Sequence, residues 1–350
     1  MTVRDRNADR DADDVGENAQ GDEPASTSAS EAGRVPEFFI VGHQKCGTTA
    51  LYLMLRTHPQ LFLSHVKEPR YFAFDQRSRR AGGAGGPGRP RSLEVYRQLF
   101  AEARPDQLAG DASPQYLRSA VAAGAIAEVR PDARIIAILR EPAAYLHSFH
   151  LQMVSSNVET ERDLRRALAL EDERRAGRRI PRRSQHPDAL LYSNHVRYTE
   201  QLRRFHEVFP REQVLVLIYE EFLRDNKNTL REVLGFLGVD PARAIEPVQT
   251  YKVRSVRHLS LHYMANMARR ARRNPAAASH LGRAVSMLTP GFAADERFRR
   301  RWRSFVYGAP PPPDPQLMAE LRQRFKPEVQ ALSEYLGRDL VSLWGYDDVG

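Results

Sequence analysis

Three short runs of apolar residues dominate the hydrophobic pattern of this chain. Each run is of buried-strand type and is followed by a segment with helical periodicity, an alternation that is typical of parallel sheets covered on both faces. The strands are expected at Phe38–Val41, Arg134–Leu139 and Val214–Tyr219. We therefore predict an α/β fold with a central parallel sheet and helices on both faces.

The same periodicity places the helices of this prediction. One long helix near the C-terminus has an apolar face at Leu317, Leu321, Phe325, Val329, Leu332 and Leu336 and is expected to pack against the body of the protein. The other helices are expected near residues 50–55, 93–103, 142–153, 161–177, 194–208 and 228–237. A glycine-rich stretch at residues 81–88 predicts a flexible loop.

The loop after the first strand has the chemistry of an anion site. Gly42 and Gly47 allow close backbone approach, so that amides can converge on an anion at the positive N-terminus of the following helix. Lys45 adds a mobile charge, and Thr48 and Thr49 add hydroxyl donors. A phosphate or a sulfate fits such a loop.

The position of the lysine distinguishes this loop from that of an NTPase. The NTPase pattern G-x-x-x-x-G-K-[ST] has lysine after the second glycine, where this chain has Thr48. The segment instead resembles the K-x-G-T-[ST] loop of sulfotransferases that use 3′-phosphoadenosine-5′-phosphosulfate (PAPS), and so implies their P-loop NTPase-like sulfotransferase fold. The resemblance implies a 5′-phosphosulfate site formed by Lys45, Cys46, Gly47, Thr48 and Thr49. From the loop alone, a nucleotide kinase or another NTPase and a plain strand–turn–helix remain alternatives.

A second segment matches the family's signature for the 3′-phosphate. Arg140 ends the second predicted strand, and Ser148 follows eight residues later in a helix. The resemblance implies that both residues bind the 3′-phosphate, and that Tyr198 contacts this phosphate or the adenine. Each residue also has an alternative role. Arg140 could cap a helix or pair with Glu141, Ser148 could face solvent, and Tyr198 could be a core tyrosine.

The segment at residues 67–72 supplies the candidate base. It resembles the K-E-x-x-[FY]-F segment of Golgi-type carbohydrate sulfotransferases and their bacterial relatives, which implies that Glu68 accepts the proton of the acceptor hydroxyl. The alternative is a loop carboxylate paired with Lys67 or Arg70. Four histidines are weaker candidates for the base, namely His43, His65, His147 and His150.

The segment at residues 110–116 resembles the G-E-x-[ST]-P-x-Y stretch of the same enzymes. Several of those enzymes have a lysine where this chain has Ala112. Ser113 and Tyr116 are candidates to line the acceptor site, and a Ser-Pro turn with a packed tyrosine is an equal alternative. A clean copy of the family's further 3′-phosphate loop is missing, with Arg254, Arg257 and Arg299–Arg301 as its candidates.

Charge and composition add limits to this picture. Residues 1–34 carry four arginines against nine Asp and Glu residues and have little apolar content, which predicts a disordered acidic tail before a single sulfotransferase domain at 35–350. The whole chain has a net charge of +9, so the domain is strongly basic and suits an anionic donor and an acidic acceptor. Its basic clusters are scattered without a nucleic-acid-binding motif, so nucleic acid is not expected as a partner.

The remaining patterns concern compartment and cofactors. No apolar stretch approaches eighteen residues and the N-terminus is acidic, which argues against a membrane span and a signal peptide. A lone cysteine, Cys46, excludes an internal disulfide, and we expect a cytoplasmic protein. Cys46 is either a reactive thiol beside Lys45 or a small residue at a variable loop position. We find no metal-binding motif and expect none to be needed.

Together these patterns predict a PAPS-dependent sulfotransferase. The expected acceptor is a hydroxyl of a sugar or a small secondary metabolite, with Lys45 and Glu68 as the catalytic residues. A P-loop kinase-like phosphotransferase and a non-catalytic protein that binds PAPS or the bisphosphate are the alternative functions. The resemblance extends from about Pro36 to Trp344. It identifies neither the acceptor nor the oligomeric state.

Overall fold

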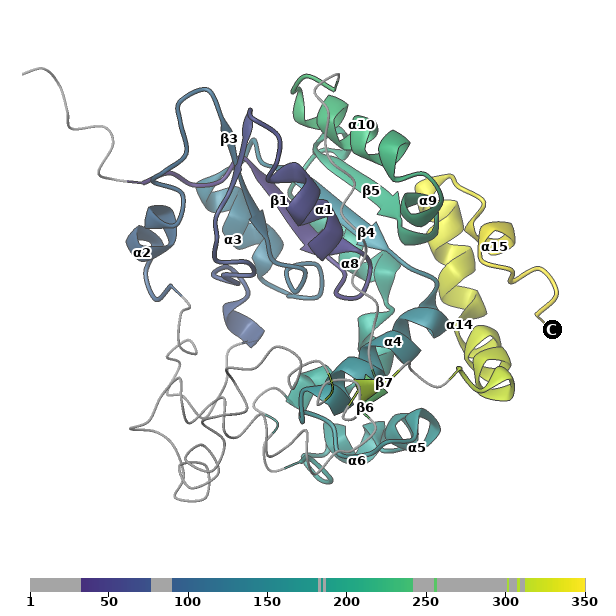
Figure 1. Cartoon of the computed structure of the whole chain (residues 1–350). Helices are drawn as coiled ribbons and strands as arrows, with labels where there is room; N and C mark the ends of the chain where they lie inside the picture. Colours follow the sequence, from purple (N-terminus) through teal and green to yellow (C-terminus); the bar gives the residue numbers. More distant parts are fainter. Residues whose placement is uncertain are drawn as a thin grey trace, which may run out of the picture. The chain divides into compact units, whose positions relative to one another are not determined.

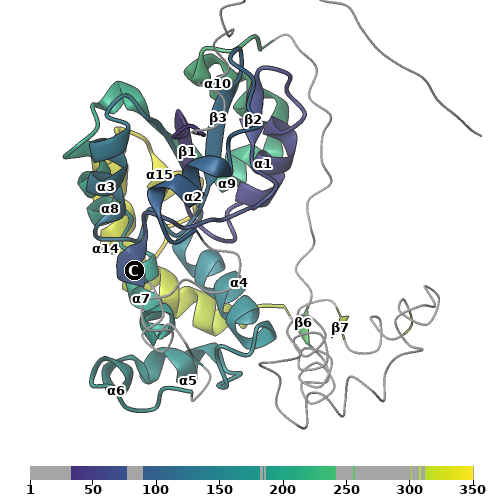
Figure 2. The same cartoon turned by 90° about the vertical axis from the view of Figure 1, so that its left-hand side faces the viewer.

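The computed structural model describes residues 33–76, 90–181, 184, 187–241, 255–256, 301, 307–308 and 312–349. Within them, five parallel strands form one sheet in the order β2-β3-β1-β4-β5 (Figure 1; β2 is labelled in Figure 2). The strands are β1 (Phe38–Gly42), β2 (Leu61–Leu63), β3 (Leu108–Ala112), β4 (Arg134–Leu139) and β5 (Val214–Ile218). A short antiparallel pair joins β6 (Ser255–Val256) to β7 (Tyr307–Gly308). The predicted α/β fold with a central parallel sheet is confirmed.

The centre of the sheet consists of the strands with the strongest sequence signal. Every residue of β1 is buried, and β1 pairs with β3 on one side and β4 on the other. Its pairing with β4 is irregular between Ile40 and Gly42, where the strand leads into the candidate anion loop. The predicted third strand ends one residue early, because Tyr219 begins a helix.

Two strands lack a signal that the sequence analysis could use. β2 has three residues, and β3 contains glycine and aspartate, which disfavour strands. Gly110 is nevertheless required there, because a Cβ atom at this position would lie 2.1 Å from the Phe38 ring. β3 thus depends on its place between β1 and β2 rather than on its own propensity.

Helices cover both faces of the sheet. The helices are α1 (Thr48–Leu55), α2 (Leu93–Gln98), α3 (Ala122–Val129), α4 (Pro142–Ser155), α5 (Leu164–Ala169), α6 (Glu171–Arg175), α7 (Tyr192–His195), α8 (Tyr198–His206), α9 (Tyr219–Arg224), α10 (Asn226–Leu237), α14 (Pro315–Leu336) and α15 (Leu340–Leu343). Figure 2 shows α3 and α8 on one side of the sheet, with α1 and α10 on the other. In the described residues, no helix combines the length and the apolar character that a membrane crossing needs.

The C-terminal helix is confirmed, whereas two predicted helices are each divided in two. Five of the six apolar residues of the predicted face of α14 are buried, and the sixth, Leu336, is partly buried against the core. The helix expected at residues 161–177 is broken at Leu170 into α5 and α6, and Asp163 caps the first of them. The helix expected at 194–208 begins earlier and is broken at Val196–Arg197, between α7 and α8.

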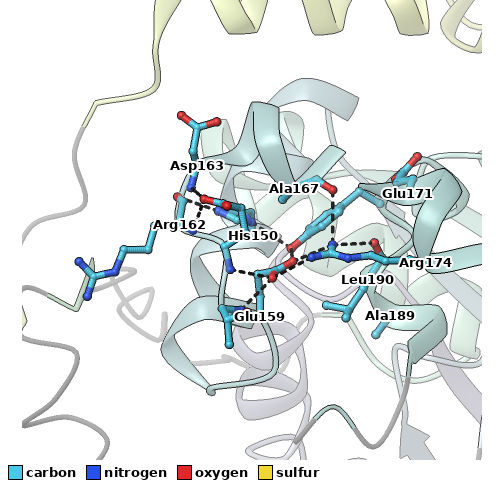
Figure 3. A network of polar contacts seen from close by, with 12 residues as sticks. His150, Glu159, Arg162, Asp163, Ala167, Glu171, Arg174, Ala189 and Leu190 are labelled. Atoms are coloured by element: carbon cyan, nitrogen blue, oxygen red, sulfur yellow. Dashed lines mark hydrogen bonds and ion pairs between the residues drawn. The ribbon is translucent and has the colours of Figure 1, made fainter. Parts of the chain in front are cut away.

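A buried ion pair holds the α4–α7 region together (Figure 3). Arg174 on α6 lies 2.8 Å from Glu159, and both side chains are at most 1% exposed. The Tyr192 hydroxyl donates to Glu159 over 3.1 Å, and His150 on α4 lies 2.9 Å from that hydroxyl. Because buried charges need partners, this network ties three helices to one loop.

Several predictions fall outside the described residues. They concern most of the acidic tail, the glycine-rich stretch at 81–88, and the arginines at 254, 257, 299 and 300. The segment at residues 178–187, which we expected to be irregular, is described only in part.

Candidate functional site

All candidate segments leave the same edge of the sheet. The strands are parallel, so the carboxyl ends of β1, β2, β3 and β4 lie at one edge. The anion loop follows β1, the Glu68 segment follows β2, residues 113–116 follow β3 and Arg140 follows β4. Ligands of open α/β sheets bind at this edge. The topology therefore gathers at one place the residues that the sequence analysis singled out separately.

The loop between β1 and α1 leaves a helix N-terminus open. Gly47, the N-cap of α1, has a φ of 82°, which glycine adopts without strain, and no side chain caps the first turn of the helix. Lys45 adopts a φ of 64°, which is unusual for a residue with a side chain. An uncapped helix N-terminus presents free amides and partial positive charge to an anion.

Gly42 has a different role from the one we expected. Its φ is not in the left-handed region, but a Cβ atom here would lie 2.4 Å from the Leu117 side chain. The Leu117 amide also donates to the Val41 carbonyl over 2.7 Å. Gly42 is therefore needed for packing between the ends of β1 and β3, whereas Gly47 shapes the loop itself.

Two cations meet at this loop. The Arg140 guanidinium donates to the Lys45 carbonyl over 3.1 Å and lies 4.7 Å from the centre of the Tyr219 ring. Burial and the nearby Arg140 charge lower the pKa of Lys45. Within the described part of the chain, no acidic side chain forms an ion pair with either residue. The two like charges therefore favour the binding of an anion.

Ser148 provides a further unsatisfied donor. It is 5% exposed, and its hydroxyl has no hydrogen-bond partner among the residues that the structure describes. Glu141, rather than Arg140, caps α4 by accepting from the amides of Ala143 and Ala144. The alternatives of a helix-capping Arg140 and a solvent-facing Ser148 are thus not what the structure contains.

The Tyr198 side chain supports Arg140 from within the core. Its ring is fully buried, and its hydroxyl donates to the Arg140 carbonyl over 3.0 Å. Tyr198 is therefore a core tyrosine, which was the alternative interpretation. The predicted contact of Tyr198 with the donor stays a prediction, and its observed contact fixes the end of β4.

The remaining loop residues differ in their exposure. Cys46 is fully buried, and burial raises the pKa of its thiol far above the ordinary value, so the group is protonated and a poor nucleophile. Thr48 is buried, whereas Thr49 is exposed. The structure thus favours the interpretation of Cys46 as a small packed residue over that of a reactive thiol.

Glu68 lies in a strained turn and is surrounded by donors. Glu68 and Arg70 have φ values of 62° and 56°, which cost on the order of 1 kcal/mol each or more. The Glu68 carboxylate accepts from Lys67 over 2.6 Å, from Gln115 over 3.1 Å and also from Arg70. The pairing with Lys67 and Arg70 that we considered as an alternative is therefore present.

These partners determine the charge of Glu68. Burial raises its pKa, but the positive charges of Lys67 and Arg70 outweigh burial and hold the pKa at about 2. Glu68 is therefore an ionised carboxylate at neutral pH, although its basicity in this arrangement is low. A change in either ion pair would increase that basicity.

The structure separates the four histidines. His43 is buried 2.6 Å from the Gln201 side-chain oxygen, and burial lowers its pKa to about 4. His150 belongs to the buried network around Glu159. His65 is exposed, and His147 is partly buried on α4. The latter two remain candidates for a base, whereas the first two have structural partners.

Ser113 and Tyr116 lie beneath the Glu68 turn and not at a surface. Both are fully buried, and both hydroxyls donate to the Asp111 carboxylate, over 2.7 and 2.8 Å. Asp111 and Gln115 belong to the same segment at residues 110–116, but neither was predicted to have a role. The signal available was a carboxylate in a strand of small residues, where burial requires partners.

One helix connects the anion loop to the Glu68 turn. α1 starts at the loop, and its Tyr52 hydroxyl donates to the Ser64 carbonyl over 2.6 Å. The Lys67 ammonium lies 5.9 Å from the centre of the Tyr52 ring. The cationic loop and the carboxylate turn are thus parts of one packed unit at the carboxyl edge of the sheet.

Comparison with known proteins assigns this unit to a class. A sequence model of the Sulfotransferase family matches residues 36–243, which is more than half of the chain, so the chain belongs to the Sulfotransferase family. The resemblance found in the sequence is thereby confirmed. The matched range includes the anion loop, the Glu68 turn, the end of β3 and the start of α4.

The relatives that match include proteins named as carbohydrate or heparan sulfate sulfotransferases. The chain is 24% identical over 253 residues to "Carbohydrate sulfotransferase 15" of Rattus norvegicus, with 59% of this chain and 44% of that protein covered. It is 27% identical over 218 residues to "Heparan sulfate glucosamine 3-O-sulfotransferase 3B1" of Mus musculus, covering 62% and 50%. The matched part is thus at most half of these relatives' length.

A solved bacterial structure resembles the whole fold. The crystal structure of a sulfotransferase from Alicyclobacillus acidocaldarius has a TM-score of 0.63 and 26% identity, and the match covers 89% of this chain and 99% of that one. The central parallel sheet with flanking helices is therefore the sulfotransferase fold that the loop predicted.

Proposed function

We propose that this protein transfers a sulfuryl group from PAPS to a hydroxyl of a sugar or a small secondary metabolite. The observation that carries the proposal is that Lys45 and Arg140, which form no ion pair among the described residues, meet at the loop before an uncapped helix N-terminus. A donor with two phosphate groups and a sulfate supplies the anions that this arrangement lacks.

The residues present fit such a donor. The amides at the start of α1 and the Lys45 ammonium suit the 5′-phosphosulfate, with Cys46, Gly47, Thr48 and Thr49 completing the loop. Arg140 and the unpartnered hydroxyl of Ser148 suit the 3′-phosphate. Burying a hydroxyl without a partner is costly, so a ligand oxygen at Ser148 would recover that cost.

The proposed reaction is an in-line displacement at sulfur. The acceptor oxygen forms a bond to sulfur while the bond from sulfur to the bridging phosphate oxygen breaks, and adenosine 3′,5′-bisphosphate leaves. Glu68 takes the proton of the acceptor hydroxyl. Lys45 and the loop amides stabilise the negative charge that develops on the bridging oxygen. No metal ion is needed for this balance.

The low basicity of Glu68 places a condition on this scheme. A base is most effective when its pKa is near the working pH, and two ion pairs hold Glu68 far below it. An acceptor that draws Arg70 or Lys67 away would raise the basicity of Glu68 on binding. An acidic glycan or an acidic metabolite meets this condition, consistent with the basic composition of the chain.

The first experiment compares ligands by thermal unfolding. A ligand that binds only the folded state at a hundred times its Kd stabilises by about 2.7 kcal/mol. We expect adenosine 3′,5′-bisphosphate to raise the Tm clearly and ATP with Mg²⁺ to do so far less. The opposite order would favour a kinase-like phosphotransferase and would overturn the assignment of the donor.

The second experiment tests transfer itself. The purified protein is incubated with labelled PAPS and extracts of its host, and products with an added sulfo group are identified by mass spectrometry. Binding of the bisphosphate without transfer to any acceptor would favour the non-catalytic alternative. The cytoplasmic location and the single domain at 35–350 stay predictions alongside this proposal.

A further inference from the structure

A buried carboxylate lies directly below the turn that carries Glu68. Asp111 on β3 is 1% exposed, and no cation pairs with it among the described residues. Its oxygens accept from three hydroxyls, those of Ser113 over 2.7 Å and of Tyr96 and Tyr116 over 2.8 Å each. A carboxylate buried at such a cost needs all of these donors.

Two of the three hydroxyls continue to the Glu68 turn. The Ser113 oxygen accepts from the Arg70 amide over 3.0 Å, and the Tyr116 oxygen accepts more weakly from the Phe72 amide over 3.5 Å. The Tyr96 hydroxyl has no hydrogen bond to the turn within the described structure, although its ring stacks on Tyr71 at 4.9 Å. The three donors to Asp111 are therefore not equivalent.

The chemistry of Asp111 fixes the direction of these bonds. An ionised carboxylate only accepts, so each hydroxyl must direct its hydrogen toward Asp111. The lone pairs of Ser113 and Tyr116 then face the amides of the turn. A neutral amide or an apolar side chain at position 111 would not impose this orientation.

The turn requires such a support. Glu68 and Arg70 both have left-handed backbone angles, and conformations of this kind persist only where surrounding contacts determine them. The segment after β3 also contacts the Glu68 carboxylate directly, because the Gln115 side chain donates a hydrogen bond to it. The residues that follow β3 thus hold both the backbone and the side chain of Glu68.

We propose that Asp111 is a positioning residue for Glu68, acting through Ser113 and, more weakly, through Tyr116. The inference rests on the proposed function of Glu68 as the base. Asp111 touches neither the donor nor the acceptor in this scheme. It orients the hydroxyls that keep the strained turn, and hence the Glu68 carboxylate, in the position for proton transfer.

The titration of Asp111 supports this role. Burial raises its pKa to about 6, while the hydrogen bonds from Ser113, Tyr116 and Tyr96 oppose the increase and the Glu68 charge adds to it. The Asp111 carboxylate is therefore ionised in most protein molecules at a pH of about 7.5. Below pH 6 it takes up a proton, and one of its oxygens then competes with the hydroxyls as a donor.

The first test uses no turnover. Hydrogen exchange of the 67–72 segment is measured in Ser113→Ala and in the matched control Tyr96→Phe, each of which removes one hydrogen bond to the same carboxylate. We expect faster exchange of the Arg70 amide, about tenfold or more, in Ser113→Ala, which deletes the acceptor of that amide, and also in Asp111→Asn, which keeps Ser113 but no longer fixes the direction of its hydroxyl. Tyr96→Phe should change it little. Unchanged exchange in Asp111→Asn would overturn the relay, and this result does not depend on any acceptor being found.

The second test separates positioning from general stability. Where transfer is measurable, we expect Ser113→Ala to lower kcat about tenfold to a hundredfold with little change in the KM for PAPS, because a small misplacement of a reacting group is costly. Tyr96→Phe should retain kcat within about twofold, and Ser113→Thr should restore most of it. A fall in kcat of the same size in Tyr96→Phe would show a merely structural effect.

A double mutant tests whether Ser113 acts through Glu68. If Ser113 acts through Glu68, its removal costs little further rate once Glu68→Gln has removed the base. Independent, additive losses in the double variant would overturn the proposal. Loss of transfer in every variant and in the parent would contradict the proposed function instead, and the exchange measurement would then still decide the positioning role.

Discussion

The anion loop and the Glu68 turn differ in how their charged groups are paired. Around the anion loop, Lys45 and Arg140 form no ion pair in the described structure, and the Ser148 hydroxyl is buried without a partner there. Around Glu68 the carboxylate already has three donors. The two cations of the first region form no ion pair among the described residues, whereas both oxygens of the Glu68 carboxylate are paired, although the Arg70 Nε beside it has no hydrogen-bond partner among them.

This difference shows that a ligand-binding group and a general base are recognised by opposite features of a structure. Unsatisfied buried groups are costly and mark a place where a ligand supplies the missing partners. A fully paired carboxylate has the opposite property, because binding must first disturb its pairs before it can act as a base. The predictions below test this contrast in order of expected effect.

The largest effect is expected for Lys45→Ala. Removing a group that stabilises developing charge typically lowers kcat by about a hundredfold to a thousandfold. The exposed Lys227 on α10 offers a matched control, since Lys227→Ala removes the same charge away from the site. Steady-state kinetics with PAPS measures both, and unchanged kcat in Lys45→Ala would remove its proposed role.

The next effect concerns the base. Glu68→Gln keeps the shape of the side chain and should lower kcat by about a hundredfold, within the usual range for a general base. Binding of adenosine 3′,5′-bisphosphate should be unaffected. Glu94→Gln, at an exposed position on α2, is the matched control. Full turnover of Glu68→Gln would direct attention to His65 or His147.

A smaller effect is expected for Ser148→Ala. This variant tests most directly whether an unpaired group at the anion loop binds a ligand. Because the Ser148 hydroxyl has no partner, its removal should not destabilise the free protein. The gain in Tm from adenosine 3′,5′-bisphosphate should shrink, by an amount that corresponds to about 1 kcal/mol of binding. A loss of Tm in the free protein, with full stabilisation by the ligand, would contradict a ligand-binding hydroxyl.

The smallest effect is a shift in pH dependence. The pKa of Glu68 is held at about 2 despite burial, by Lys67 and Arg70, so its stabilising ion pairs are present above the ordinary pKa of 4.5 and lost as the pH falls toward 2. Arg70→Gln should move the pKa of Glu68 upward. Acid unfolding followed by circular dichroism should then lose less stability between pH 4.5 and 2 than in the parent.

The contrary result for Arg70→Gln is equally informative. An unchanged acid transition would mean that Lys67 alone determines the charge of Glu68. Lys67→Gln then serves as the reciprocal variant, because its ammonium lies 2.6 Å from the same carboxylate. Opposite shifts in the two variants would contradict the picture of two cations acting on one acid.

The amino-acid sequence by itself determined the central strands and predicted an anion loop. β1 and β4 are continuous apolar runs that only a sheet covered on both faces can bury, and the order of Gly42, Lys45 and Gly47 indicates an anion site without reference to the rest of the chain. Arg140 and Ser148 could be singled out because their spacing resembles the 3′-phosphate signature of the sulfotransferases.

Only the tertiary structure decided the rest. β3 is a strand because its neighbours pair with it, Gly42 is a glycine because Leu117 packs there, and Ser113 and Tyr116 are buried below the Glu68 turn rather than lining it. Local patterns record propensity and spacing, whereas these features depend on contacts between residues far apart in the chain, which no local pattern contains.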